Sequence, residues 1–270
     1  MGGLRDRVAI ITGAARGIGA ASAQRLAADG ARVIVTDVDL AGAREVAAAI
    51  EDRGGTATAV QVDTRARSDL EGAVALAQDR FDRLDVLHHN AGVGCFGPLE
   101  TTTEEAIRDL VDVNVIGMLN GLAVVGPALR DGGGGVIVLT GSLVAEHGTA
   151  FQVPYIATKG AVSAMTRAAA MELAPDVRVN AVCPGTVRTE GLLDTFGSPE
   201  AVAAIDASAA RTIPLGRMAR PEEIASVVAF LASDDASYMT GETVIVGGGW
   251  SAGTSLASTM DVAVAPEVDS

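Results

Sequence analysis

The sequence predicts an α/β protein in which a single parallel sheet has helices on both faces, the doubly wound arrangement. Short apolar runs without polar alternation recur along the 270-residue chain, as expected for strands buried on both faces. Ala-rich segments of helical length separate these runs, and regular alternation of strand and helix favours one parallel sheet. No linker, internal repeat or charged block interrupts the pattern, so one domain is expected.

The first expected strand, residues 8–11, runs into the glycine-rich loop Thr12-Gly13-Ala14-Ala15-Arg16-Gly17-Ile18-Gly19 and then a helix. Glycines at such a turn let the backbone approach a phosphate, and the helix N-terminus favours its negative charge. The spacing departs from the usual Gly-x-Gly-x-x-Gly pattern, and an ordinary turn is the alternative. The position between an apolar strand and a helix favours phosphate binding.

The second expected strand, residues 32–36, ends at Asp37. An acidic side chain about 20 residues beyond such a loop accepts hydrogen bonds from the adenosine ribose of a dinucleotide. The same carboxylate would repel a 2′-phosphate, and residues 38–40 carry no basic side chain, so NAD is preferred over NADP. Two readings compete with this: Asp37 caps the next helix, or Arg16 reaches a 2′-phosphate.

The third and fourth expected strands, residues 57–62 and 84–88, end at Asp63 and at the turn Asn90-Ala91-Gly92. Both lie where α/β sheets place their ligands. Asp63 either contacts an adenine amino group or caps the following helix. That helix is expected to run to Phe81 from a capping box of Ser68 and Glu71.

A second capping box, Thr102 with Glu105, opens a long helix that contains Asn114 and ends at residues 132–135. Asparagine is unfavourable inside an apolar helix, so Asn114 is expected to have a polar task or a nearby carbonyl partner. The fifth strand, residues 136–139, leads to Ser142.

Tyr155 and Lys159 lie four residues apart in a helix expected to reach Leu173, and this spacing puts them on one face. A lysine ammonium favours the phenolate of a nearby tyrosine and makes proton transfer feasible. A serine hydroxyl from another strand end, Ser142, could then hydrogen-bond a substrate oxygen. The simpler reading is a half-exposed pair that occurs by chance.

The last part of the chain holds a sixth strand, residues 177–182, then Cys183-Pro184-Gly185, and a seventh strand at 242–246 after a helix that begins at Pro221. Residues 186–214 between them show weak periodicity, and a segment of this length over a strand end predicts a mobile substrate lid. Residues 1–250 thus form one domain, and 251–270 a loose tail.

Composition excludes several classes of protein. A net charge of −14 argues against a nucleic-acid partner. Cys95 and Cys183 lack metal-ligand spacing, so no metal and two buried free thiols are expected. No run of about 18 apolar residues predicts a membrane span, and the polar N-terminus lacks a signal core. We therefore expect a cytoplasmic protein without a membrane partner.

Together, the glycine loop, the Asn90 turn, Asn114, Ser142, the Tyr155-x-x-x-Lys159 pair, Pro184-Gly185 and the segment 237–241 resemble the short-chain dehydrogenase/reductase family over about residues 5–250. The resemblance implies a seven-stranded Rossmann-like sheet in the order 3-2-1-4-5-6-7, a bound dinucleotide and an oligomer, commonly a tetramer. His89, Gly141 and Gly247 depart from the family pattern, which more often has Asn, Ser and Asp there.

The resemblance also implies roles for single residues. Tyr155 would be the general acid/base, Lys159 would stabilise its phenolate and bind the nicotinamide ribose, Ser142 would polarise the substrate oxygen, and Asn114 would hold a water. The cofactor site would comprise Gly13, Arg16, Gly17, Ile18, Gly19, Asp37, Val38, Asp63, Thr64, Asn90, Ala91, Gly92, Tyr155, Lys159, Pro184, Gly185, Val187 and Thr189.

The expected substrate site is mostly apolar. Its candidate residues are 94–96, Leu143, Val144, His147, Phe151, Val153, Leu192, Leu193 and Phe196. They favour a mainly hydrophobic secondary alcohol or ketone as the substrate, whose oxidation by NAD makes the chain an oxidoreductase. The alternatives are an NADPH-dependent ketoreductase of the 3-oxoacyl-carrier-protein type and a non-catalytic dinucleotide-binding module.

Overall fold

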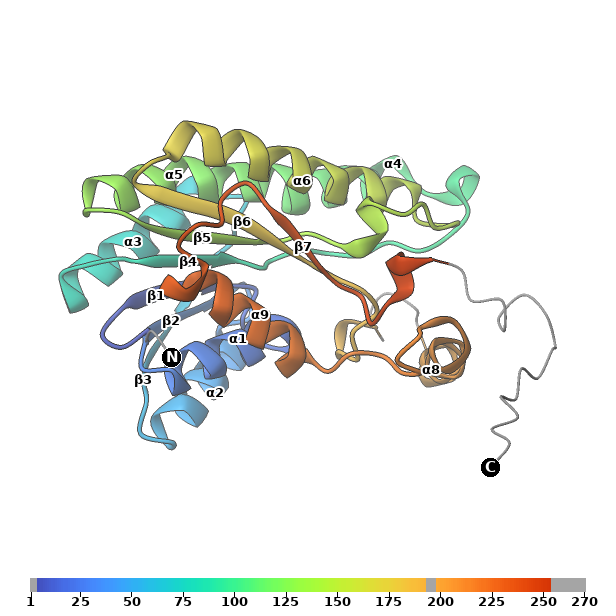
Figure 1. Cartoon of the computed structure of the whole chain (residues 1–270), viewed down its shortest axis with the longest axis horizontal. Helices are drawn as coiled ribbons and strands as arrows, with labels where there is room; N and C mark the ends of the chain where they lie inside the picture. The colour runs from blue at the N-terminus through green and yellow to red at the C-terminus, as the bar shows by residue number, and fades with distance from the viewer. Residues whose placement is uncertain (1–3, 193–197, 254–270) are drawn as a thin grey trace, which may run out of the picture.

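The computed structural model describes residues 4–192 and 198–253, and in them seven parallel strands form one sheet in the order β3-β2-β1-β4-β5-β6-β7 (Figure 1). This is the predicted order. The strands are β1 Val8–Thr12, β2 Arg32–Asp37, β3 Thr56–Gln61, β4 Val86–His89, β5 Gly135–Thr140, β6 Val177–Pro184 and β7 Thr243–Val246. The chain order reverses between β1 and β4, and this is where an open α/β sheet forms its ligand crevice.

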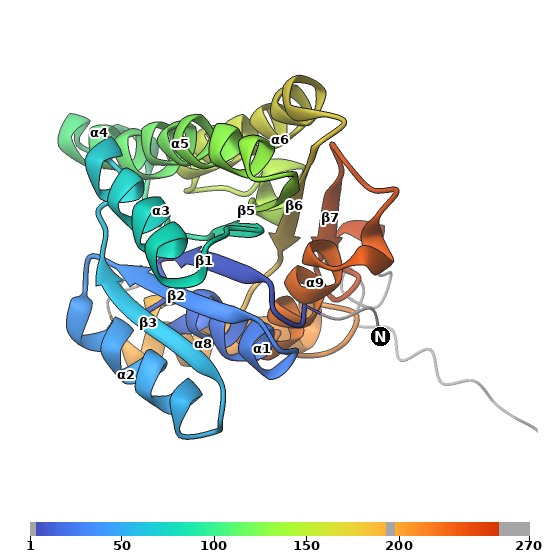
Figure 2. The same ribbon diagram turned by 90° about the vertical axis from the view of Figure 1, so that its left-hand side faces the viewer.

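Two layers of helices cover the sheet (Figure 2). The principal helices are α1 Gly17–Ala28, α2 Leu40–Glu51, α3 Arg67–Phe81, α4 Glu104–Val111, α5 Met118–Asp131, α6 Val153–Leu173, α8 Pro199–Thr212 and α9 Pro221–Ala232. Helices α1, α2 and α9 pack on one face, and α3, α5 and α6 on the other.

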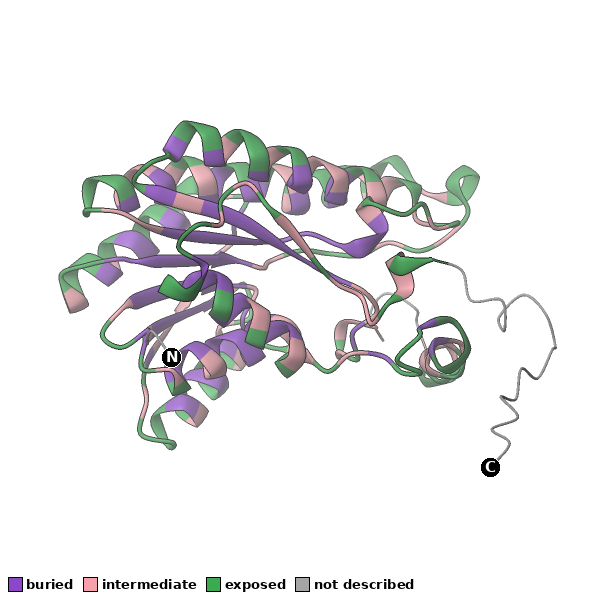
Figure 3. Cartoon of the chain, in the orientation of Figure 1, coloured by how far each residue is buried: buried purple, intermediate pink, exposed green. Residues whose placement is uncertain are grey.

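The core consists of two apolar layers, one on each side of the sheet. Central strands are buried on both faces, whereas the helices are buried only where they face the sheet (Figure 3). Val, Ile, Leu and Ala fill both layers. Small and β-branched side chains suit close packing of helices on a parallel sheet.

Both predicted capping boxes are wrong in position. Helix α3 begins at Arg67 after Ala66, so Ser68 already lies inside its first turn and caps nothing. Thr103, not Thr102, caps α4 by accepting from the backbone N–H of Ala106 at 3.2 Å. The Thr102 hydroxyl instead donates to the carbonyl of Pro98 at 3.1 Å.

The expected long helix around Asn114 is interrupted. Between α4 and α5, residues Asp112–Gly117 form a π-helical turn, η2, a feature that often accompanies functional sites. The run Glu104–Asp131 is, by length and composition alone, apolar enough to cross a membrane, but 44% of its most apolar window is buried in the protein and α5 packs against α3 and α6. This is the behaviour of a core helix.

The segment predicted as an irregular lid contains a regular helix. Pro199–Thr212 forms α8, and the Ser198 hydroxyl caps it by accepting from the N–H of Ala201 at 3.1 Å. Residues 193–197 and the tail beyond residue 253 lie outside the described residues. Of the two free cysteines, Cys183 is buried as expected, whereas Cys95 is only partly buried.

Candidate active site

A cavity of about 840 Å³ opens at the carboxyl ends of the strands. Of the residues proposed from sequence as cofactor or catalytic groups, all but two line it. These are Gly13, Arg16, Gly17, Ile18, Asp37, Val38, Asp63, Thr64, Asn90, Ala91, Gly92, Ser142, Tyr155, Lys159, Pro184, Gly185, Val187 and Thr189. The exceptions are Gly19 and Asn114, which lie behind the wall and support it.

The glycine loop is closed on its inner side and open toward the cavity. Gly13 has φ +61°, and a Cβ there would meet the Cα of Ala91 at 2.7 Å. A Cβ on Gly19 would come within 2.1 Å of the carbonyl oxygen of Gly13. Among the described residues no side chain caps the N-terminus of α1, whose first residues Gly17 and Ile18 line the cavity. A backbone cradle next to an uncapped helix start suits a phosphate-bearing cofactor.

Asp37 stands at the end of β2 with its carboxylate bound to the backbone. One oxygen accepts from the N–H of Ala15 at 2.9 Å, and the other from the N–H of Asp39 at 3.0 Å. Asp39, not Asp37, caps α2, by accepting from Gly42 at 3.1 Å. The capping alternative for Asp37 is therefore wrong, and the carboxylate is held at the cavity wall.

Asp63 does not cap α3. Its carboxylate forms an ion pair with Arg65 at 2.7 Å and also accepts from the Arg65 backbone N–H. The hydrogen bonds from Arg65 lower the pKa of Asp63. Arg65 itself lines the cavity, so this end of the site carries both charges.

The turn after β4 is fixed by a threonine on β1. The Oγ1 of Thr12 accepts from the N–H of Asn90 at 3.0 Å and from that of Ala91 at 3.1 Å. The side-chain amide of Asn90 donates to the carbonyl of Gly13 at 3.0 Å. The glycine loop and the Asn90 turn are thus one rigid unit.

Asn114 is fully buried in η2, where its amide ties three segments together. It accepts from the N–H of Val93 at 2.8 Å and donates to the carbonyl of Val93 at 2.9 Å. It also donates to the Thr158 hydroxyl in α6 at 3.1 Å. The structure shows the carbonyl partner that was one of the two alternatives for Asn114, and the same amide joins the chain after the Asn90 turn to the helix of Tyr155.

Ser142, Tyr155 and Lys159 lie close together in the wall of the cavity. The Ser142 hydroxyl, just beyond β5, lies close enough to the Tyr155 phenol to act on its pKa, which it lowers. The Lys159 ammonium lies 5.9 Å from the centre of the Tyr155 ring and donates to the carbonyl of Thr140 at 2.9 Å. Three groups able to bind, donate and accept protons therefore converge from β5 and α6.

Burial controls the protonation of this cluster. Desolvation raises the pKa of Tyr155 above its usual value, and the hydrogen bond from Ser142 only partly offsets it. From sequence, Lys159 was expected to favour the phenolate; here burial instead raises the pKa of Tyr155, and Ser142 is the group that opposes the rise. Burial also lowers the pKa of Lys159 to about 8. At neutral pH the ammonium is still mostly charged.

Lys159 is the single lysine of the chain: the other 19 of the 20 basic Lys and Arg residues are arginines. An arginine guanidinium does not lose its proton in proteins, whereas a lysine changes its pKa readily when buried. The one lysine in a sequence that otherwise uses only arginine therefore stands at a buried position next to Tyr155.

Sequence reasoning missed the far wall of the cavity. Helix α8 presents four residues at helical spacing, Ile205, Ser208, Ala209 and Thr212, and Trp250, a few residues beyond β7, adds to this wall. The i, i+3, i+4, i+7 spacing was readable, but Ala, Ser and Thr weaken the apolar signal. Of the proposed substrate residues, Gly94, Phe96, Val144 and Leu192 line the cavity, whereas Cys95, Leu143, His147, Phe151 and Val153 do not. Leu193 and Phe196 lie outside the described residues.

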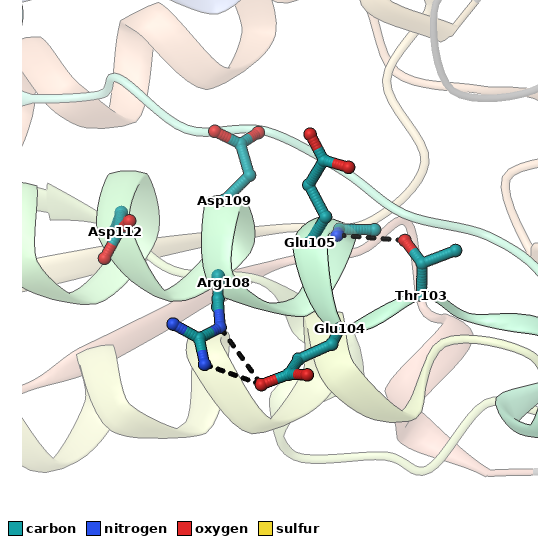
Figure 4. Close-up of a pocket in the computed structure, with 7 residues that line it drawn as sticks. Thr103, Glu104, Glu105, Arg108, Asp109 and Asp112 are labelled. Carbon is teal, nitrogen blue, oxygen red and sulfur yellow. Dashed lines mark hydrogen bonds and ion pairs between the residues drawn. The ribbon is translucent and has the colours of Figure 1, made fainter.

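A second hollow, of about 710 Å³, lies at the start of α4 (Figure 4). Figure 4 shows Glu105 and Asp109 on one side of the helix and the Arg108–Glu104 pair, 2.6 Å apart, on the other. Its lining includes no histidine and no cysteine. In residues 4–192 and 198–253, no three His, Cys, Asp or Glu side chains converge as a metal site.

A doubly wound sheet with a glycine loop and a Ser–Tyr–Lys cluster at one edge defines a class, the nicotinamide-dependent α/β oxidoreductases. Comparison with known proteins agrees. The family described as enoyl-(acyl carrier protein) reductase matches residues 13–251. A short-chain dehydrogenase/reductase from Mycobacterium marinum has 33% identity and a TM-score of 0.86, covering 93% of this chain and 98% of its own.

Two relatives are named by their substrates. The chain is 37% identical to cyclohexanol dehydrogenase of an Acinetobacter species, covering 91% of this chain and 95% of the relative. It is 36% identical to trans-4-hydroxycyclohexanecarboxylate dehydrogenase of Sinomonas cyclohexanicum, with 93% and 95% covered. The chain belongs to the short-chain dehydrogenase/reductase family.

Proposed function

We propose that this chain is an NAD-dependent dehydrogenase of hydrophobic, cyclic secondary alcohols, in which Tyr155 exchanges a proton with the substrate oxygen. The observation that carries the proposal is that Ser142, Tyr155 and the chain's single lysine, Lys159, line one large cavity together, with the Lys159 ammonium 5.9 Å from the centre of the Tyr155 ring. A module that only binds a dinucleotide needs no such cluster.

The cofactor would be held by the cradle and the strand ends. The glycine loop and the start of α1 suit its phosphates, Asp37 its adenosine ribose, and the Asn90 turn the chain between them. When bound, the nicotinamide supplies the acceptor for the hydride that leaves the substrate carbon.

Asp37 supports NAD over NADP. Its carboxylate is fixed by two backbone N–H groups at the cavity wall, so it cannot swing away from a 2′-phosphate. The neighbour Val38 is apolar and exposed. Arg16 also lines the cavity, where its charge could bind the 2′-phosphate of NADP. The comparison of NAD with NADP must therefore exclude a preference for NADP.

Each residue of the site then has its own role in alcohol oxidation. Ser142 donates to the substrate oxygen and orients it toward Tyr155. Tyr155, as phenolate, takes the hydroxyl proton, and the mostly charged ammonium of Lys159 stabilises that phenolate across the low-dielectric pocket. Burial raises the pKa of Tyr155, so the phenolate fraction is small at neutral pH and the oxidation rate should rise from there toward pH 8, above which Lys159 loses its charge. Asn114 fixes η2 against α6 through its hydrogen bond to Thr158.

The walls of the cavity favour a neutral ring as substrate. Apart from Lys159, its charged lining residues, Arg16, Asp37, Asp63, Arg65 and Asp109, all come from the first 109 residues. The opposite wall is apolar or uncharged. It consists of Phe96, Val144, Thr149, Gln152, Leu192, Ile205, Ser208, Ala209, Thr212, Ile213 and Trp250. Two relatives with cyclohexane alcohols in their names support a six-membered ring.

The test is NAD reduction measured with a panel of cyclohexanol, linear secondary alcohols and hydroxycyclohexanecarboxylates. We expect cyclohexanol to be oxidised with NAD at a kcat/KM at least about tenfold above that with NADP, a difference of about 1.4 kcal/mol. Asp37→Asn removes the charge but keeps one acceptor oxygen, so the ratio of kcat/KM with NAD to kcat/KM with NADP should fall toward one. A carboxylate as best substrate, or NADP as preferred cofactor in the wild type, would contradict the proposal.

A further inference from the structure

Strand β4 ends in two consecutive histidines, His88 and His89, both fully buried. Successive side chains of a strand point to opposite faces, and the two rings indeed contact different partners. The His89 ring has two: its Nδ1 is 3.1 Å from the Oγ1 of Thr12, and its Nε2 is 3.0 Å from the carbonyl oxygen of Gly117. A family position that usually holds Asn is here filled by a bridging ring.

The chemistry of these partners fixes the proton on the His89 ring. A carbonyl oxygen can only accept, so Nε2 carries the hydrogen and donates to Gly117. Nδ1 is then a bare acceptor and receives the Thr12 hydroxyl hydrogen. The Thr12 oxygen keeps both lone pairs for the N–H groups of Asn90 and Ala91, the bonds seen at 3.0 and 3.1 Å. One tautomer satisfies every group in this chain of hydrogen bonds.

Close packing against α5 also fixes the position of the His89 ring. A Cβ on Gly121 of α5 would lie 2.1 Å from the Cδ2 of His89, so only glycine leaves room for the imidazole. Gly117, the acceptor, ends the π-helical turn that contains Asn114. A single ring therefore touches the end of β1, the Asn90 turn through Thr12, and the helical segment that anchors Val93.

Burial lowers the pKa of His89 to about 4, and the nearby positive charge of Lys159 acts in the same direction. The ring is neutral throughout the range in which alcohol dehydrogenation would be assayed. It is a fixed hydrogen-bonding spacer and not a proton carrier.

We propose that His89 is a positioning residue for the dinucleotide: through Thr12 it holds the Asn90–Ala91 turn in its binding position and ties that turn to the segment of Asn114. The inference rests on the proposed function, since it assumes that the turn contacts the cofactor. An asparagine side chain is too short to reach Thr12 and Gly117 across the same gap, so His89→Asn releases at least one end.

The first test is dinucleotide binding, followed by the fluorescence of Trp250, the single tryptophan of the chain and part of the cavity wall. His89→Asn should weaken NAD binding about tenfold, because a buried hydroxyl or carbonyl loses its partner. At saturating NAD, kcat should stay within about threefold, since Ser142, Tyr155 and Lys159 are untouched. His147→Asn, at an exposed loop position, is the matched control and should change neither.

A double-mutant cycle separates positioning from general damage. Gly121→Ala should weaken NAD binding in the wild-type background, where its methyl group collides with the His89 ring. In the His89→Asn background the collision partner is shorter, and the same change should add less than about twofold. If Gly121→Ala weakened NAD binding equally in both backgrounds, the close contact between residue 121 and the His89 ring would be contradicted.

Histidine labelled with ¹⁵N gives a readout independent of activity, because the chain has only three histidines. The His89 signals should report the neutral tautomer protonated at Nε2 at pH 7. A proton on Nδ1, or NAD binding by His89→Asn as tight as in the wild type, would overturn the positioning role alone. A wild type that binds neither NAD nor NADP would overturn the proposed function as well.

Discussion

Lys159 carries a charge into the interior beside a phenol. Only 4% of its surface is exposed, and its ammonium donates to the carbonyl of Thr140 at 2.9 Å. Desolvation of the ammonium is why its pKa falls to about 8. The residue is mostly charged at neutral pH, and burial of that charge is unfavourable for the fold.

The pKa of Lys159 can be measured without ambiguity, because a [¹³C]lysine label reports one residue only. The Cε resonance should titrate near pH 8, well below the value of about 10.4 for an exposed lysine. An inflection above pH 10 would contradict the burial of the ammonium.

The same shift has a consequence for stability. Between pH 8 and about 10.4 the unfolded chain holds a proton that the folded chain has released, so the free energy of unfolding rises with pH in this window. Compared with Lys159→Met, the free energy of unfolding of the wild type should rise by about 3 kcal/mol by the upper end of this pH window, at 1.36 kcal/mol for each pKa unit. Urea unfolding of both proteins from pH 7 to 10 gives that difference.

At the scale of an element, the turn from β1 into α1 depends on the absence of side chains. Gly19 lies in the first turn of α1 with the backbone carbonyl of Gly13 only 2.1 Å from where its Cβ would be. Backbone cannot move aside as a flexible side chain can. The loop is therefore shaped by contact between its own two ends.

Gly19→Ala should destabilise the protein by about 1–3 kcal/mol, the usual cost of overpacking, and weaken NAD binding with it. Gly72→Ala is the matched control, because this glycine lies within α3 with no atom within 4 Å of the added methyl group. There alanine should stabilise by up to about 1 kcal/mol through helix propensity. Urea unfolding distinguishes the two; equal effects would contradict the tight loop.

The elements differ in how far sequence reasoning could locate them. The seven strands were predictable within one or two residues, since runs such as that of β1 or β5 are apolar throughout and bounded by turns. The two capping boxes were wrong because the hydroxyls of Ser68 and Thr102 match a pattern that neighbouring residues satisfy in space. The π-helical turn at Asn114 has no local signature, and α8 was missed because its cavity face is built from Ala, Ser and Thr.

The residues of the site also differ in how far sequence could identify them. Glycine spacing, Asp37 and the Tyr155–Lys159 pair were readable because each function constrains residue type at short range. The roles of His89 and Trp250 depend on partners 77 residues away at Thr12 or on the closure of the cavity wall by α8. Contacts of this kind are set by the topology of the sheet and not by local pattern.

At the scale of the whole molecule, charge and apolarity occupy different parts of one cavity. Its charged lining comes from the β1–α4 half of the chain together with Lys159, while α8 and Trp250 line the other side with uncharged groups. The reversal of strand order between β1 and β4 opens the crevice on one side of the catalytic cluster. This division supports a charged cofactor and a neutral substrate that meet at Tyr155.

The most direct test of that account measures NAD affinity and NAD reduction on the same preparations of wild type and Tyr155→Phe. The variant should bind NAD within about threefold of the wild type and lose about 10²–10⁴-fold in kcat, the usual contribution of a general acid or base. Retained turnover in the variant, or a wild type that binds no NAD, would contradict the central claim.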